Sequence, residues 1–235
     1  MIEKENLSCI ICNHKNLQNL HMHGYSYYKC SLCNHIFSND NEMFCKEKIN
    51  RVSKSNLIKE KLLIQNYPST NCDIFFKEDI EIKNHYLELV KNNKEHYNIL
   101  DCNIIHNNLK SKYGNVNFYG SYINYFFKDF HLNDKNIKEN ILHINNKFDM
   151  ILCINYIEYS YCPYDLIILL KSLLKKETLK PSIILSVNID NNPKTNYLAR
   201  IHEFSRKSAE IFVEQVSSSY RLLFKHNRVI AEIDS

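Results

Sequence analysis

Short runs of nearly continuous apolar residues recur through the second half of the chain, separated by longer mixed segments. Strands that are covered on both faces of a parallel sheet have this composition. The runs that we interpret as buried strands lie at residues 98–101, 116–119, 148–154 and 182–187. Two further apolar runs, 220–224 and 229–233, are expected to be late strands of the same sheet.

The segments between these runs have apolar residues three or four positions apart, which is the period of an amphipathic helix. One such stripe lies between residues 74 and 97. Another starts at Pro163, a residue favoured in the first turn of a helix, and continues to residue 174. A third spans 204–216. Alternating strands and helices predict an α/β fold with a mostly parallel sheet.

A different pattern, rich in cysteine, occupies the N-terminal region. Two C-x-x-C pairs are separated by seventeen residues, the spacing of a tetrahedral four-thiolate zinc site. The predicted ligands are Cys9, Cys12, Cys30 and Cys33. Asn13 and Asn34 follow the two pairs, where the chain must turn with positive φ, and asparagine tolerates that conformation best among non-glycine residues. A redox dithiol would need a strand-to-helix turn, which precedes neither pair. Four thiolates complete a tetrahedral site, so the nearby histidines are not needed as zinc ligands.

Composition limits the classes of protein to which the chain can belong. The 235 residues are 44% hydrophobic and 24% charged, with a net charge of +4, which suits one α/β domain with a small appended module. The N-terminus has no apolar leader and no run is long enough to cross a bilayer, so we expect a cytoplasmic protein without a membrane partner. The expected division is a zinc ribbon at 1–38, a helical linker at 39–73 and the α/β domain at 74–235. The remaining cysteines are expected to be small buried hydrophobes; they are Cys45, Cys72, Cys102, Cys153 and Cys162.

Several short motifs occur in an order that resembles a known family. Ile99-Leu100-Asp101 is similar to the apolar-Leu-Asp start of its first motif, and Phe148-Asp149-Met150-Ile151 is similar to its Phe-Asp-x-Ile strand. Ile157-Glu158 and Pro163 follow at the expected spacing. With the ribbon in front, the chain resembles class I S-adenosylmethionine-dependent methyltransferases that have an N-terminal zinc ribbon. The resemblance implies a Rossmann-like methyltransferase sheet that binds S-adenosylmethionine beyond Asp101, near Asn103 and Tyr122.

The sequence departs from the family pattern at the cofactor loop. The first-motif glycines, which let backbone approach the cofactor, are replaced by the run Cys102-Asn103-Ile104-Ile105-His106. Tyr122 stands where an acidic residue would bind the ribose hydroxyls. These departures favour a degenerate cofactor site and a non-catalytic protein that acts as a binding or assembly component with a protein partner. The alternative is an active methyltransferase whose acceptor is a small molecule, a sugar or a nucleic acid.

A third class of function is nucleic-acid binding through the ribbon. Its support is an aromatic and basic stretch with Tyr25, Tyr27, Tyr28 and Lys29, although aromatic residues in a ribbon more often form its core. Two other residues have an ordinary and a functional interpretation. Glu158 either lines an acceptor pocket or forms a surface pair, and His202 is either an acid–base group or a solvated side chain.

Overall fold

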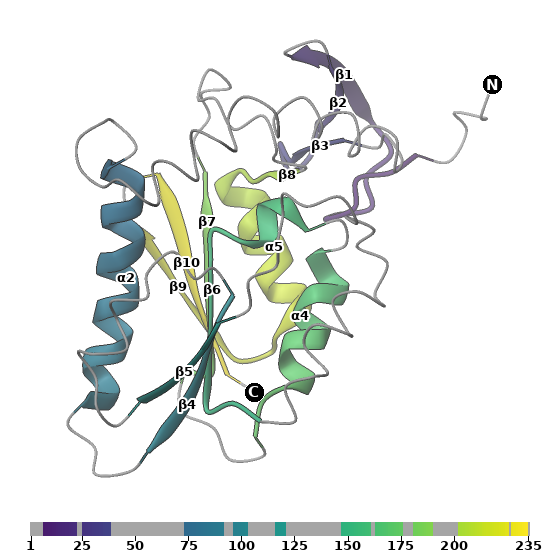
Figure 1. The fold of residues 1–235 in the computed structure, drawn as a ribbon. Coiled ribbons are helices and arrows are strands. Elements are labelled where there is room, and N and C mark those ends of the chain that lie inside the picture. The colour runs from purple at the N-terminus through teal and green to yellow at the C-terminus, as the bar shows by residue number, and fades with distance from the viewer. Residues whose placement is uncertain are drawn as a thin grey trace.

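The computed structural model describes ten segments of the chain, which form two sheets and the helices around them (Figure 1). They are residues 7–22, 25–38, 73–91, 96–102, 116–120, 147–160, 163–175, 181–189, 202–225 and 227–234. Most of the predicted linker at 39–73 lies outside them.

The main sheet has six strands in the order β5-β4-β6-β7-β10-β9. Its strands are β4 (Tyr97–Asp101), β5 (Val116–Gly120), β6 (Met150–Ile154), β7 (Ile183–Asn188), β9 (Tyr220–Lys225) and β10 (Arg228–Ile233). The pairs β4–β5, β4–β6 and β6–β7 are parallel, whereas β10 is antiparallel to both β7 and β9. The predicted α/β fold is therefore confirmed, with a mixed sheet in which β4, β5, β6 and β7 are parallel and β10 is antiparallel to its neighbours.

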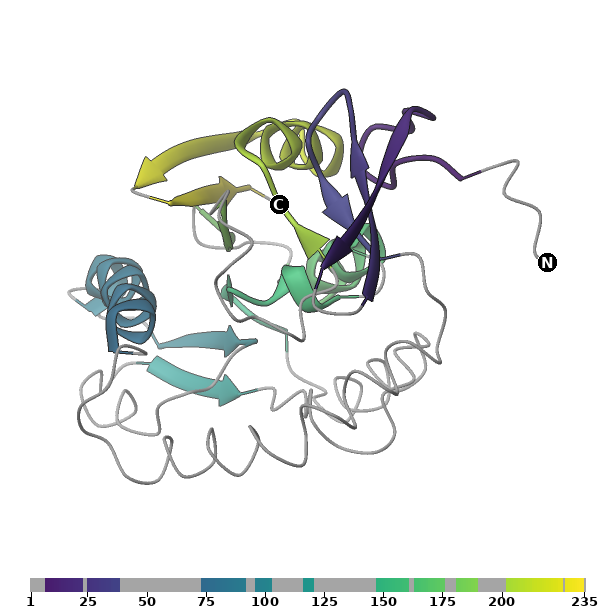
Figure 2. The ribbon, with the colours of Figure 1, turned by 90° about the horizontal axis from the view of Figure 1, so that it is seen from above.

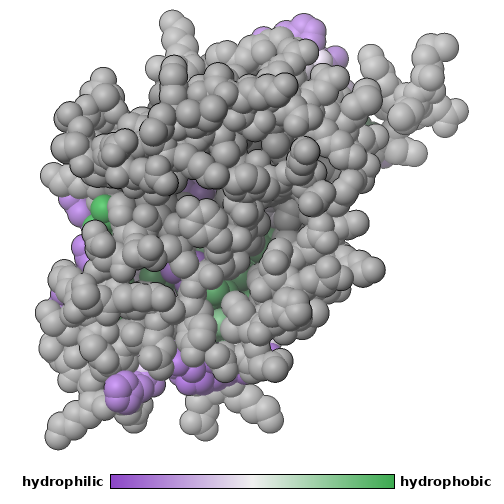
Figure 3. All heavy atoms as spheres, viewed as in Figure 1, coloured by the Kyte–Doolittle hydropathy of each residue, from purple (hydrophilic) through white to green (hydrophobic). Residues whose placement is uncertain are grey.

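Helices cover both faces of this sheet, so the domain has three layers (Figures 1 and 2). Helix α2 (Asp73–Lys91) packs on one face with Ile82, Tyr86 and Leu87 against apolar residues of β4, β6, β7 and β10. Helices α4 (Pro163–Ser172) and α5 (Arg206–Val216) cover the other face, where the larger core lies. A short 3-10 helix, η3 (Ile157–Tyr159), follows β6. In the space-filling view, hydrophilic residues are visible mainly along the lower edge, and hydrophobic residues are visible near the centre and at the left edge (Figure 3).

The second sheet joins the ribbon to the domain. Its order is β1 (Leu17–Met22), β2 (Tyr25–Cys30), β3 (Ile36–Phe37) and β8 (His202–Glu203). The last strand comes from the C-terminal part of the chain and pairs antiparallel with β3. The ribbon's sheet is thus completed by a strand that is distant in sequence, and its core is continuous with the core under α4 and α5.

Two local expectations are corrected by this arrangement. His202 is buried in β8 and is not solvated, because its strand is covered by the ribbon. Helix α5 begins at Arg206, two residues later than the apolar stripe suggests, because Ser205 caps it: its side chain accepts a hydrogen bond from the backbone N–H of Ser208. Within the described part of the chain, no helix is long and apolar enough to cross a membrane.

Candidate functional sites

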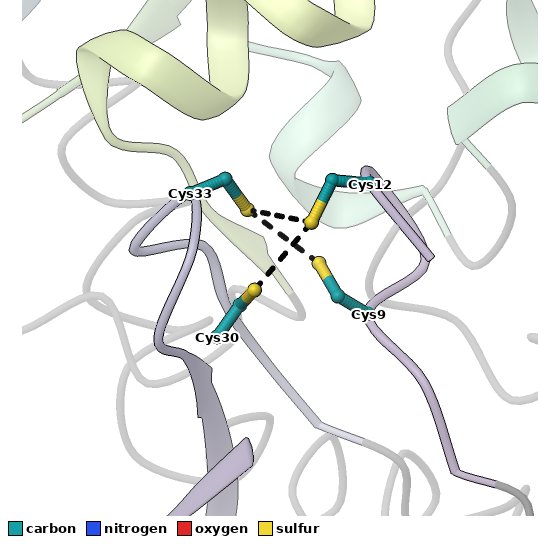
Figure 4. A group of neighbouring side chains, drawn as sticks. All are labelled: Cys9, Cys12, Cys30 and Cys33. Atoms are coloured by element: carbon teal, nitrogen blue, oxygen red, sulfur yellow. Dashed lines mark hydrogen bonds between the residues drawn. The ribbon is translucent and has the colours of Figure 1, made fainter. Parts of the chain in front are cut away.

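The four cysteines predicted as zinc ligands converge on one point of the ribbon (Figure 4). Their sulfur atoms all lie within 4.8 Å of one another. The Sγ atoms are 3.6 Å apart for Cys9 and Cys33, and 3.5 Å apart for both Cys12–Cys30 and Cys12–Cys33. Three of the thiols are buried and Cys12 is half-buried. Four sulfur donors at this spacing fit a closed tetrahedral zinc site of the structural kind.

The backbone at the two pairs of cysteines is nearly identical. Asn13 and Asn34 each have φ of 57°, which confirms the predicted left-handed turns. Each asparagine N–H donates to the carbonyl of the first cysteine of its pair, at 2.8 Å for Cys9 and 2.9 Å for Cys30. These turns direct both cysteines of a pair toward the same centre.

The thiols influence each other's ionisation. A hydrogen bond from Cys33 lowers the pKa of Cys9 to about 5, whereas the same interaction and burial raise the pKa of Cys33. One thiolate is therefore favoured even among the four thiols alone, and thiolate is the form that binds metal.

Among the described side chains of the ribbon, aromatic residues contribute to its interior. Tyr27 is buried, and the ring of Tyr28 lies 6.0 Å from that of Phe37. His35 is also buried, and its Nε2 lies 3.2 Å from Nδ1 of His202, so that this histidine is engaged outside the cysteine cluster. These contacts support the core interpretation of the aromatic stretch over the nucleic-acid interpretation.

A second group of polar residues lies at the carboxyl ends of β4, β6 and β7, where cofactors bind in sheets of this type. Asp101, the acidic residue of the first motif, ends β4 and is buried. Its Oδ2 accepts a hydrogen bond from Nζ of Lys83 on α2 at 2.7 Å. Both side chains are almost inaccessible, at 7% and 2% exposure. The predicted cofactor residue therefore forms a buried ion pair within the chain.

A neighbouring network, also anchored on α2, contains Asp79, one helical turn before Lys83. The Asp79 carboxylate accepts hydrogen bonds from Nδ2 of Asn155 at 2.7 and 2.8 Å and from the guanidinium of Arg228. Asn155 follows β6 with φ of 49°, and its Oδ1 accepts a hydrogen bond from Asn188 at 3.1 Å. Burial raises the pKa of Asp79, and the positive charge of Arg228 opposes that shift.

Glu158 is fully buried, which rules out a surface ion pair for it. Its Oε1 accepts a hydrogen bond from the backbone N–H of Asn188 at 2.9 Å. It therefore ties η3 to the end of β7 instead of lying at the surface.

The other predicted cofactor residues, Asn103 and Tyr122, lie outside the described residues, as do Ile104, Ile105 and His106. Of the five scattered cysteines, Cys102 and Cys153 are buried, as expected, and the other three lie outside the described segments. A hydrogen bond with Cys102, followed by burial, raises the pKa of Cys153 well above its usual value.

Sequence reasoning missed Asp79, Lys83 and Arg228. The available signal was weak: Asp79 and Lys83 are four residues apart and bracket Ile82 on the buried stripe of α2. Charged residues on a buried stripe require partners, but the distant strands that supply those partners carry no local pattern.

Comparison with solved structures identifies the architecture. Magnesium protoporphyrin IX methyltransferase from Synechocystis PCC 6803, solved with bound S-adenosylmethionine, matches with a TM-score of 0.51 at 13% identity, over 84% of this chain and all of that one. The same enzyme with bound S-adenosylhomocysteine matches with a TM-score of 0.48 at 13% identity, over 81% and 100% of the two chains. An O-methyltransferase family protein from Burkholderia thailandensis gives 0.37 at 10% identity, over 69% and 59%. No family model and no curated protein matches the chain. The chain has the fold of class I S-adenosylmethionine-dependent methyltransferases, with a zinc-ribbon-like cysteine cluster.

Proposed function

We propose that this chain is a non-catalytic protein of methyltransferase fold that acts as a binding or assembly component with a protein partner. The observation that carries the proposal is the buried ion pair between Lys83 and Asp101. The residue that would face the cofactor at the end of the first strand has its charge neutralised by the chain itself.

Displacing this ion pair would be costly. A ligand that used Asp101 would have to separate it from Lys83, and breaking a buried ion pair is strongly unfavourable. The neighbouring Asp79 is engaged in the same way, so a ligand would also have to compete for its carboxylate. It forms an ion pair with the buried Arg228 and accepts a hydrogen bond from Asn155. These contacts support the proposal that this edge does not hold S-adenosylmethionine in the family's usual manner.

The loop sequence supports the same conclusion. Cys102-Asn103-Ile104-Ile105 contains no glycine, and β-branched residues are poor at positive φ. Tyr122 cannot supply the charge-assisted hydrogen bond that an acidic residue makes to ribose. The loss of that bond alone is expected to weaken affinity roughly tenfold to a hundredfold.

The ribbon, in this proposal, holds one zinc ion through Cys9, Cys12, Cys30 and Cys33. Four thiolates leave no open coordination position, so the metal would stabilise the fold and would not activate water or substrate. About thirty residues cannot build a sufficient core by themselves, so the metal would add to the stability that the ribbon gains from the core it shares with α4 and α5.

Isothermal titration calorimetry of the purified zinc-loaded protein with S-adenosylmethionine tests the proposal. We expect no saturable heat, or a dissociation constant in the millimolar range. A dissociation constant in the low micromolar range would overturn it. Circular dichroism and metal analysis of the same sample establish that the protein is folded and loaded when the titration is made.

The second candidate is an active S-adenosylmethionine-dependent methyltransferase whose acceptor is a small molecule, a sugar or a nucleic acid. The observation that favours it is the likeness over 84% of the chain to a structure solved with that cofactor. Low-micromolar binding, followed by formation of S-adenosylhomocysteine on adding an acceptor, would support this candidate.

A further inference from the structure

Strand β9 forms the outer edge of the main sheet, at the opposite end from β5 (Figure 2). Among the described residues, β10 is its sole partner strand. Tyr220 and Phe224 are 37% and 41% exposed, and they belong to the few large hydrophobic side chains that the described surface exposes. A sheet edge with exposed aromatic residues is a template for pairing with another strand.

The hairpin geometry determines which backbone groups face outward. The backbone N–H of Asp234 donates to the carbonyl of Ser219 at 3.1 Å, which makes 219 and 234 a hydrogen-bonded pair. Hydrogen-bonded pairs alternate with non-hydrogen-bonded pairs along an antiparallel ladder. The backbone groups of residues 221, 223 and 225 therefore also form hydrogen bonds with β10. Tyr220, Leu222 and Phe224 consequently direct their N–H and C=O groups away from the sheet.

We propose that β9 pairs antiparallel with β9 of a second copy of this chain, with Leu222 on the two-fold axis. This register places Tyr220 opposite Phe224 of the other copy, and aromatic cross-strand pairs are favourable. On the opposite face of the sheet, Arg221 lies opposite Leu223 of the other copy. The resulting dimer has one continuous sheet of twelve strands, twice the six in each chain.

The two adjacent symmetric registers bring like charges together. If residue 221 lies on the two-fold axis, Arg221 is opposite Arg221 of the other copy. If residue 223 lies on the axis, Arg221 is opposite Lys225 of the other copy. Like charges directly opposite each other destabilise a strand pair. Within the chain, Arg221 and Lys225 form ion pairs with Glu232 and Glu81, and these lie on the α2 side of the strand. Charge complementarity thus selects the register centred on Leu222.

Helix α5 adds a second complementarity. The guanidinium carbon of Arg206 lies 3.7 Å from the centre of the Phe224 ring, and Tyr220 donates from its hydroxyl to Glu214 at 3.3 Å. Because Phe224 faces Tyr220 of the other copy, Arg206 is brought next to the other copy's Glu214. The two-fold axis repeats this contact, so that two pairs of opposite charge flank the shared sheet. The inference does not depend on whether the chain binds S-adenosylmethionine.

Sedimentation equilibrium of the full chain at low salt tests the proposal through charge reversal. In Arg206→Glu, the new glutamate meets Glu214 of the other copy; in Glu214→Arg, the new arginine meets Arg206. We expect each variant alone to dimerise at least about tenfold more weakly than the wild type, because two ion pairs are replaced by two repulsions. An equimolar mixture restores opposite charges at both contacts and is expected to dimerise like the wild type.

The mixture shows whether weaker dimerisation of a variant comes from this interface, from a loss of folding or from another contact. Arg206 and Glu214 are two helical turns apart, so recovery on mixing can come only from pairing between two copies. Lys207→Glu on the same helix is the control for a change in net charge, and its dimerisation is expected to match the wild type. A monomeric wild-type protein at tens of micromolar would overturn the proposal. Variants that dimerise normally, or a mixture that stays as weak as its components, would also overturn it.

Discussion

The imidazole rings of His35 and His202 are stacked, with centroids 5.3 Å apart and Nε2 of the first 3.2 Å from Nδ1 of the second. The two residues are 167 positions apart in the chain, and both are buried. Phe204 packs against His35 with a ring separation of 4.8 Å. This contact joins the knuckle of Cys30 and Cys33 to the strand that precedes α5, so the ribbon and the domain share one core.

Zinc removal is therefore predicted to destabilise the whole chain and not only the ribbon. We expect a chelator to lower the melting temperature of a single transition in differential scanning calorimetry, because the cysteine cluster packs in the same core as α4 and α5. Hydrogen exchange should then rise in α5 as well as in β1 and β2. An unchanged main transition, with faster exchange confined to residues before 38, would show that the ribbon is an independent unit.

Zinc content is predicted to be one equivalent per chain. Cys30→Ser removes one of four thiolates and should lower the metal measured by elemental analysis after purification to well below half an equivalent. Cys153→Ser is the matched control, because Cys153 is equally buried but lies in β6, away from the cluster. Full zinc retention in Cys30→Ser would remove the four-thiolate assignment.

Lys83→Met is predicted to destabilise the domain strongly. It removes the ammonium that pairs with Asp101, and breaking a buried ion pair from one side costs about 3–5 kcal/mol. The double variant Lys83→Met with Asp101→Leu removes both charges and should recover most of the free energy of unfolding measured in urea. Equal losses in the single and double variants would mean that packing, and not charge, makes Lys83 necessary.

Ser205→Ala is predicted to lower the free energy of unfolding by about 1–2 kcal/mol, the cost of losing a helix cap. Ser205 caps α5 and also donates from Oγ to the carbonyl of Cys33 at 2.5 Å, so the substitution weakens both helix and knuckle. Ser172→Ala, at the exposed end of α4, is the control and should change stability little. An effect of Ser205→Ala no larger than the control's would argue against this cap.

Local patterns are sufficient to predict where the strands of the main sheet lie along the chain, and they also predict the cysteine cluster. Continuous apolar runs are required of strands covered on both faces, and β6 and β7 are fully buried. The cysteine spacing and the two asparagines were equally informative, since a knuckle requires its ligands and its turn within a few residues. Strand β8 was not predicted, because two residues are too short to show a period.

Period, composition and ligand spacing are local properties, so they predict from the amino-acid sequence that an α/β sheet follows a four-cysteine ribbon. Three contacts are visible only in the folded chain: Lys83 pairs with Asp101, Arg228 pairs with Asp79, and His202 contacts His35 of the ribbon. A charged or polar side chain can be buried only where a partner offsets its desolvation. Here the partner lies on another element, across 18, 149 or 167 residues of chain, and no local pattern specifies it.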